Sequence, residues 1–403
     1  MTTVEMQPRQ FRLSMLLYDT RYRSLTIQAV ALICFMTFAA WLVNNTVENL
    51  AALGKTFSFS FLWQRAGYDI SQTLIPYTND STHARAALVG IVNTLLVAFV
   101  GCILATVIGV FMGVLRLSNN WVVARLAAVY VDGFRNIPVL LWILATMAVL
   151  TDMAPAPTAF RGDNATASML FGSIAVTNRG LYVPWPVFGP GSQVVVGAFI
   201  LSLMAIMIFG RYAARRQEAT GEVLPTFWIK LGLFLVPALL ANLVMGGPIT
   251  LDYPVLQRFN FQGGGFIDKS FIALTLALAL YTGAFIAEAV RAGIQAVSRG
   301  QSEAAGALGL RPNRVMSLVV LPQALRVIIP PLISQYLNLT KNSSLAIAVG
   351  YADVRATLGG ITMNQTGREL ECMLLLMGFY LVLSLLISSV MNWYNARVAL
   401  KER

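Results

Sequence analysis

The chain has 403 residues, of which 57% are hydrophobic and only 12% are charged, and its formal net charge is +11. Soluble domains carry about a quarter charged residues. The apolar residues here gather into runs of about 18 or more, each long enough to cross the roughly 30 Å hydrocarbon core of a bilayer as a helix. The composition excludes an ordinary soluble domain and indicates a polytopic, all-α membrane protein.

Two classes of chemistry are disfavoured by what the sequence lacks. A single histidine, His83, argues against histidine-based metal or triad chemistry. No stretch reads GxxxxGK[ST], so the chain has no phosphate-binding loop of this type. We therefore expect no catalytic residues, no metal site and no cofactor on this chain. If ATP is used, another polypeptide hydrolyses it.

The apolar runs predict eight membrane spans, with one retained helix near the N-terminus rather than a cleaved signal. We place them at residues 25–43, 87–114, 126–150, 192–210, 228–246, 271–290, 326–349 and 372–393. Residues 151–191 lie between two spans, are rich in Pro, Gly and Thr and have no helical period. They are typical of an ordered external loop.

Basic residues are distributed unevenly around these spans. Segments 1–24, 115–125, 211–230, 291–326 and 394–403 carry 18 Lys and Arg, whereas 44–86, 151–191, 247–270 and 350–371 carry 9. Cytoplasmic loops have the excess of Lys and Arg, so we expect both termini and residues 291–326 in the cytoplasm. Membrane topology accounts for the positive charge, and no nucleic-acid partner is expected.

A short, interrupted helix is predicted outside the spans, in "QSEAAGALGLRPNRVMSLVVLPQAL" (301–325). Ser298 with Gln301 forms a capping-box pattern, Gly309 suits a helix end, and Pro312 suits the first turn of a second helix. A helix covered in Ala and Gly lets another backbone approach closely. From these residues alone, docking to a partner and lying among lipid headgroups remain two open interpretations.

The segment "EAAGALGLRPNRVMSLVVLP" resembles the EAA loop of ATP-binding-cassette (ABC) importer permeases. It matches at Glu303, Ala304, Ala305, Gly309, Val319, Leu321 and Pro322. Residues 93–118, 131–143, 279–310 and 338–350 extend the likeness to permeases for polar amino acids, the histidine/glutamine group. The five spans of that group match the second, third, sixth, seventh and eighth here. An additional first span and an insertion with two more make the layout similar to the Q-type subunit of the bacterial general L-amino-acid permease.

The resemblance implies a type I ABC importer transmembrane fold in the bacterial inner membrane, translocating L-amino acids. Glu303, Ala304, Ala305, Gly309 and Pro322 would couple the chain to two cytoplasmic ATPase subunits, which hold ATP and Mg. Further expected partners are a homologous permease subunit, favouring a heterodimer, a periplasmic amino-acid-binding protein and membrane lipid. We expect five regions along the chain. Residues 1–86 contain the first span and an external loop, 87–150 contain two core spans, and 151–265 form the insertion. Residues 266–393 complete the core and include the EAA loop at 299–322, and 394–403 form a cytoplasmic tail.

Polar residues in the seventh span are the first candidates for a substrate pathway. Pro330-Pro331 precedes "LTKNSS", and a locally unwound helix there would present Lys341, Asn342, Ser343 and Ser344 to an amino acid. Hydrogen bonding to neighbouring helices, with Lys341 reaching outward, is the other interpretation. Related permeases are often acidic where this chain has Asn342. We therefore predict a broad choice of substrate, or a preference for neutral and acidic ones.

Other polar positions lie in the third and sixth spans. Tyr281, near Thr282, is a candidate pathway residue, and Glu288 is predicted to pair with Arg291 three residues on. Asp132 and Arg135 predict a second i,i+3 ion pair, with a gate or a substrate-carboxylate contact by Arg135 as the alternative. Gly109 and Gly113 form a GxxxG pattern, which predicts close helix packing.

An ion-driven secondary transporter, with Glu288 or Asp132 as its ion site, is the main alternative function. Such transporters are commonly built from internal repeats, and no repeat pairs the two halves of this sequence. The EAA segment would also have no role in that mechanism.

Overall fold

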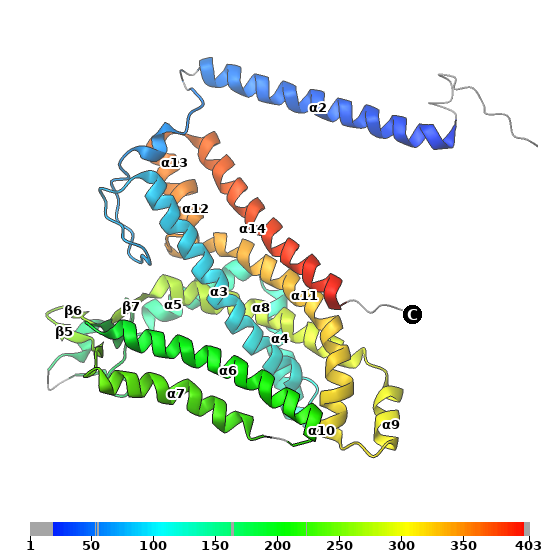
Figure 1. Ribbon diagram of the computed structural model, residues 1–403. Helices are drawn as coiled ribbons and strands as arrows, with labels where there is room; N and C mark the ends of the chain where they lie inside the picture. The colour runs from blue at the N-terminus through cyan, green and yellow to red at the C-terminus, as the bar shows by residue number, and fades with distance from the viewer. Residues whose placement is uncertain (1–18, 53, 55, 163–164, 223, 399–403) are drawn as a thin grey trace, which may run out of the picture. The chain divides into compact units, whose positions relative to one another are not determined.

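The computed structural model describes residues 19–398 other than 53, 55, 163–164 and 223 (Figure 1). Its contacts divide the chain into two compact units, Met1–Gln64 and Arg65–Arg403. The first unit contains helix α2 (Thr20–Ala52) and a short 3₁₀ helix, η1 (Ser60–Trp63). Helix α2 confirms the predicted first span and extends it at both ends, since an apolar helix continues past the hydrocarbon until a breaker occurs.

The core of the second unit is built around helix α8 (Lys269–Gln295), which packs against α3 (His83–Leu115) and α11 (Leu321–Asn342). The GxxxG glycines of α3 lie against α8. A Cβ added at Gly109 would fall 2.6 Å from the Cβ of Ile286, and one at Gly113 would fall 2.7 Å from the Ala287 carbonyl oxygen. The predicted close packing is confirmed.

The predicted continuous span at 126–150 is wrong in shape. The chain instead forms α4 (Trp121–Asn136) and α5 (Val139–Asp152), bent by 109° at the break between them. Pro138 explains the break, because its ring disfavours a helical conformation at Ile137 and it has no N–H to donate. The rings of Phe134 and Trp142 stack across the bend, with centroids 4.0 Å apart.

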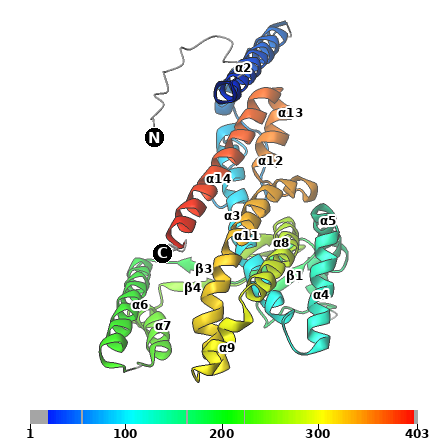
Figure 2. The same cartoon turned by 90° about the vertical axis from the view of Figure 1, so that its right-hand side faces the viewer.

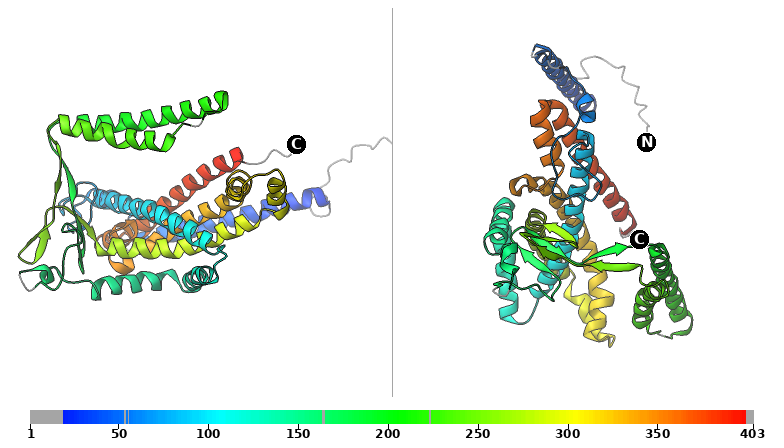
Figure 3. Two further views of the ribbon diagram at one scale, coloured as in Figure 1. Left: turned by 90° about the horizontal axis from the view of Figure 1, so that it is seen from below. Right: turned by 90° about the vertical axis from the view of Figure 1, so that its left-hand side faces the viewer.

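Helices α6 (Ser192–Thr220) and α7 (Thr226–Val244) form the two predicted spans of the insertion. They pack on one another and stand beside the core, joined to it through strands β3 and β4 (Figures 2 and 3). Counting the bent pair as one span, the described residues contain up to eight helices long and apolar enough to cross a membrane. The predicted helical membrane fold is confirmed, and seven of the eight predicted spans are single apolar helices.

Residues 151–268, which comprise the insertion and the start of the following core, also contain short strands and a 3₁₀ turn, η2 (Pro157–Phe160), which the all-α expectation missed. Three antiparallel sheets form in the described part of the chain, with strand orders β1-β2-β7, β3-β4 and β5-β6. Strands of three or four residues are too short for an alternating pattern to be recognised in sequence. They are β1 (Ala175–Thr177), β2 (Gly180–Val183), β3 (Trp185–Phe188), β4 (Ile249–Asp252), β5 (Val255–Gln257), β6 (Asn260–Gln262) and β7 (Gly265–Asp268).

After α8, the chain forms the short helix α9 (Arg299–Ala307) and then a long span of mixed helical types. That span comprises α10 (Pro312–Val315), the π-helical segment η3 (Met316–Val320), α11 and the 3₁₀ segment η4 (Ser343–Val349). A further irregular stretch follows and leads into the last span. Its elements are α12 (Val354–Ala356), the π-helical η5 (Thr357–Thr362), α13 (Met363–Thr366) and α14 (Glu369–Val398).

Candidate functional site

Helix α9 begins and ends where the sequence predicts. Ser298 occupies the N-cap position, but its side chain makes no capping hydrogen bond, so the predicted capping box is wrong in that detail. At the other end Gly309 has φ +80°, a left-handed conformation that favours glycine. The N–H of Gly309 donates to the Gly306 carbonyl and that of Leu310 to the Ala305 carbonyl, which is a Schellman helix end.

The two faces of α9 differ in kind. Ala305 is buried against Val315 and Val320, in a small apolar cluster that also includes the end of α8. On the remaining surface Glu303 and Ala304 are exposed, and 84% of Leu308 is exposed. One face thus fixes α9 to the ends of two spans. The opposite face presents small residues, the acidic Glu303 and the exposed Leu308. Such a surface suits docking of a second protein.

Pro322 lies at the start of α11, directly after the π-helical segment. Because proline has no N–H and its ring crowds the carbonyl four residues earlier, an α-helix cannot continue unchanged through it. In the wider turn, the N–H of Leu321 donates to the carbonyl of Met316, five residues back. The π-helical segment therefore lets one continuous helical span cross Pro322. Pro322 is visible in the sequence, but the π-helical segment that precedes it was not predicted.

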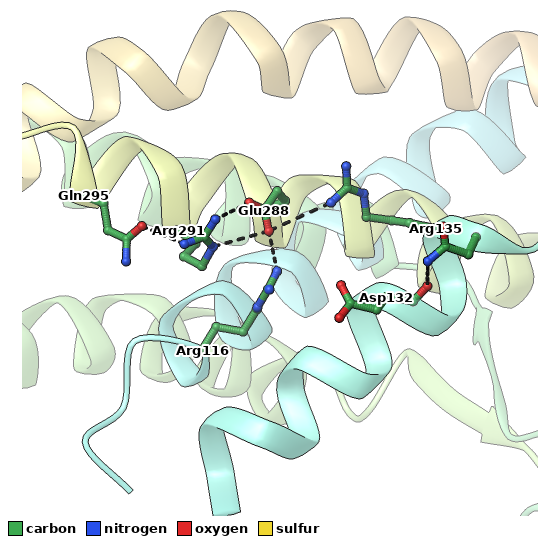
Figure 4. Close-up of polar contacts among 7 residues, drawn as sticks. Arg116, Asp132, Arg135, Glu288, Arg291 and Gln295 are labelled. Carbon is green, nitrogen blue, oxygen red and sulfur yellow. Dashed lines mark hydrogen bonds and ion pairs between the residues drawn. The ribbon is translucent and has the colours of Figure 1, made fainter. Parts of the chain in front are cut away.

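Three arginines from different parts of the chain converge on Glu288 of α8 (Figure 4). Arg291 donates to both carboxylate oxygens, with its Nη2 2.5 Å from Oε1 and its Nε 3.3 Å from Oε2. Arg116, just beyond the end of α3, also donates to Oε2, and Arg135 Nη1 of α4 lies 3.9 Å from the same oxygen. The predicted Glu288–Arg291 pair is confirmed, but it is part of a larger arginine cluster.

The predicted Asp132–Arg135 ion pair is wrong. The Arg135 side chain extends towards Glu288 (Figure 4). Its guanidinium lies 5.2 Å from the centroid of the Phe285 ring. Asp132 is exposed, and its main-chain carbonyl accepts a bond from the Asn136 side-chain nitrogen at 2.7 Å, whereas its carboxylate pairs with no described residue. A carboxylate on a neighbouring helix thus prevails over the one three residues away.

The segment at the end of α11 differs from the predicted unwound helix. The α-helix runs through Pro330 and Pro331 to Asn342 and then tightens into the 3₁₀ segment η4. Ser343 is fully buried, and its hydroxyl donates to the Thr340 carbonyl at 2.7 Å. Lys341 is exposed, whereas Asn342 and Ser344 are half-buried. The Ser343 bond is made within its own helical segment, so it supports neither a substrate contact nor the alternative of bonding to a neighbouring helix.

The candidate pathway residues fall into two groups. The ring centroids of Tyr281 and Phe285 lie 5.1 Å apart, and Arg135 covers the same Phe285, so α8 and α4 bring Tyr281 and Arg135 together. Residues 341–344 lie elsewhere, at the junction of α11 and η4. A transport role for either group stays a prediction.

Sequence reasoning missed two members of the site. Phe285 lies one helical turn after Tyr281, and Arg116 is the first cation after the second span. Arg116 could have been found from the sequence, because a basic residue at the end of an apolar run is a natural partner for an acid within the membrane. Among the described residues, no group of three or more His, Cys, Asp or Glu side chains is placed to hold a metal ion.

The described residues contain up to eight helices apolar enough to cross a membrane, and the short helix α9 is fixed to the ends of two of them, which defines a polytopic membrane protein. Comparison with known families identifies it further. The family described as "Binding-protein-dependent transport system inner membrane component" matches residues 219–400. Among its relatives is the permease protein BztB of the glutamate/glutamine/aspartate/asparagine transport system of Rhodobacter capsulatus, 57% identical and covering 98% of this chain and 97% of BztB.

Two further relatives match over nearly their whole length. The general L-amino acid transport system permease protein AapQ of Rhizobium johnstonii is 48% identical, covering 96% of this chain and 95% of AapQ. The putative amino-acid ABC transporter permease protein YhdX of Escherichia coli is 43% identical, covering 94% of this chain and 95% of YhdX. The chain belongs to the family of inner-membrane components of binding-protein-dependent transport systems, and it is a multi-pass inner-membrane protein.

The ion-driven alternative finds no support. Glu288, one of its two proposed ion sites, is occupied by arginines that would repel Na⁺. Asp132, the other, is exposed rather than enclosed by ligands. The resemblance to ABC permeases for polar amino acids, including a Q-type subunit, is confirmed by the relatives.

Proposed function

We propose that this chain is the translocation subunit of an ABC importer for L-amino acids, with a substrate range that includes neutral and acidic ones. Its relatives' names, which refer to glutamate, glutamine, aspartate, asparagine or L-amino acids in general, support this substrate class. The neutral Asn342 is consistent with it. The chain itself performs no chemistry, and ATP and Mg are held by two separate ATPase subunits.

The importer would contain a second, homologous permease, making a heterodimer, and would receive its amino acid from a periplasmic binding protein. ATP binding and hydrolysis close and open the ATPase pair, and α9 transmits that movement into the membrane helices. Tyr281 and Arg135 on one side, and Lys341 to Ser344 on the other, are the proposed pathway residues.

The observation that carries this proposal is the exposed face of α9. Its Ala305 face is fixed to the ends of α8 and η3, so a force on Glu303 or Leu308 acts directly on two spans. A helix floating in lipid headgroups would not need such an attachment.

The first prediction tests this face with two variants that each add one negative charge. Leu308→Asp should reduce co-purification of the ATPase about tenfold, the effect of losing ~1.4 kcal/mol of binding, and should reduce ATP-dependent uptake in parallel. Asn313→Asp, on the exposed surface of α10 in the same loop, is the control and should leave both near normal. Pull-down from solubilised membranes, with blotting for the permease, measures both binding and protein level.

Equal ATPase recovery with both variants, at unchanged uptake, would show that α9 is not the coupling element. Uptake that persists without ATP but collapses with the ion gradient would contradict the importer itself.

A further inference from the structure

The arginine cluster around Glu288 contains more positive charge than it can balance. Arg116, Arg135 and Arg291 face one carboxylate, so three positive charges meet one negative charge and the surplus is two. Asp132 is near in sequence but makes no ion pair with any described residue. Surplus charge of this kind in a membrane-spanning region is costly unless an anion, water or a partner protein neutralises it.

Arg135 is the least engaged of the three. Arg291 and Arg116 donate hydrogen bonds to Glu288, and Arg291 also donates to Gln295 at 2.6 Å. Arg135 lies 3.9 Å from the carboxylate, beyond hydrogen-bonding distance, and its side chain is 38% exposed. Its guanidinium rests over the Phe285 ring, which orients the planar group without using its N–H donors.

The position of Arg135 is typical of a transport site. It lies in the last turn of α4, just before the break at Ile137-Pro138, where the chain turns by 109°. Discontinuous membrane helices often form substrate sites, because their ends supply oriented polar groups. Tyr281 and Phe285 line the adjoining face of α8, and Glu288 lies seven residues, or about 10 Å, from the end of α8 that leads to α9.

We propose that Arg135, assisted by Arg116 and Arg291, binds the side-chain carboxylate of an acidic amino acid on its way to the cytoplasm. Glu288 is a resident competitor for the same guanidinium groups. This inference rests on the proposed function and specifies the substrate class that the site recognises. A planar guanidinium can pair with a carboxylate through two parallel hydrogen bonds, and an amide offers only one acceptor oxygen and no charge.

The role of Glu288 follows from the need to release what is bound. Three arginines without a competing carboxylate would retain an acidic solute, because each charge-assisted bond would have to break at once. Glu288 can replace the departing carboxylate on Arg116 and Arg291, so its presence weakens binding and speeds release. The surplus positive charge also repels lysine and arginine as solutes. The cluster therefore selects against cationic amino acids, because the one negative charge of Glu288 cancels only part of the positive charge.

The experiment measures glutamate and glutamine uptake by the complete transporter, with its ATPases, partner permease and binding protein, in proteoliposomes. Arg135→Gln should raise the KM for glutamate about tenfold while changing that for glutamine less than about twofold, since only the charged solute loses its partner. Arg125→Gln is the matched control, an exposed arginine of the same helix, and should change neither value.

Glu288→Gln provides a second, opposite signature. Removing the competitor should lower both the KM and the kcat for glutamate and leave glutamine nearly unchanged, which a purely structural ion pair would not do. An unchanged glutamate KM in either variant, or equal changes for both solutes, overturns the proposal. The proposal is also overturned if the Arg135→Gln complex loses its partner permease and Arg135→Lys restores it. Arg135 would then pair with a carboxylate of the partner protein and not with the solute. If the unmodified transporter moves neither solute with ATP, it is the proposed function that fails.

Discussion

Asp353 is a fully buried carboxyl group between the seventh and eighth spans. Its Oδ1 accepts the Ala356 N–H at 2.8 Å and caps α12, and its Oδ2 has no hydrogen-bond partner among the described residues. Next to it, the hydroxyl of Thr94 accepts the Val354 N–H, tying this corner to α3. Burial disfavours the charged form and raises the pKa of Asp353 to about 7, although bonds from backbone N–H groups oppose the shift.

The second prediction is that this residue makes the protein more stable at mildly acidic pH. The folded state binds the proton more tightly than the unfolded chain, so stability rises as the pH falls through about 7 towards the ordinary aspartate pKa. Between pH 8 and pH 6 the contribution of Asp353 should be about 1 kcal/mol. Thermal unfolding in detergent at the two pH values measures it, and Asp353→Asn, which keeps the capping oxygen, should flatten the difference. A pH dependence identical in the variant would assign the effect to other groups.

At the residue scale, the sequence predicted local partners well and distant ones poorly. Glu288 and Arg291 are three residues apart on one helix, and they pair as expected. Asp132 and Arg135 have the same spacing but do not pair, because Glu288 of another helix attracts Arg135. Spacing along the sequence identifies which residues are neighbours on one helix. It does not identify residues that two helices bring together by packing. Phe285 and Arg116 entered the site only through packing.

Single elements were predictable where a glycine or proline marks their ends. Gly309 and Pro312 delimit α9 and α10 as expected, whereas the π-helical turn before Pro322 and the sharp α4–α5 bend were not foreseen. A proline shows that the helix must change but not how. The missing N–H and the bulky ring of proline are accommodated by a wider π-helical turn before Pro322 and by a break in the helix before Pro138. Surrounding contacts select between them.

The third prediction concerns the packing of α3 on α8. Gly109→Ala would place a methyl group 2.6 Å from Ile286 Cβ and 2.8 Å from the Gly283 carbonyl oxygen, so a backbone must move. We expect a loss of about 1–3 kcal/mol, the usual cost of overpacking. Gly133→Ala in α4 is the matched control, because nothing lies within 4 Å of its Cβ position. There the better helix propensity of alanine should be neutral or favourable. Thermal unfolding of the two purified variants distinguishes them, and equal melting temperatures would contradict the tight α3–α8 contact.

At the scale of the whole molecule, α8 connects the regions that function requires. It begins directly after β7, where the Asp268 side chain caps its first turn at 2.7 Å from the Ser270 N–H. It ends next to α9, and its length of 27 residues is about 40 Å. Glu288 and Tyr281 lie along it. We expect a displacement of α9 to reach the arginine cluster through α8, which links the predicted docking surface to the predicted solute site.

The fourth prediction is that α9 and the strands of the insertion lie on opposite sides of the membrane. This arrangement requires it, and the distribution of basic residues predicts it. Two exposed positions report on it. Phe171, 94% exposed in the insertion, and Leu308, 84% exposed beside α9, can each be replaced by cysteine after Cys34, Cys102 and Cys372 are changed to serine. In intact spheroplasts a membrane-impermeant thiol reagent should label Phe171→Cys and not Leu308→Cys, and permeabilised cells should show both. Labelling of Leu308→Cys from outside would separate α9 from any cytoplasmic ATPase. It would thereby remove both the coupling role of α9 and the direction assigned to solute release at Glu288.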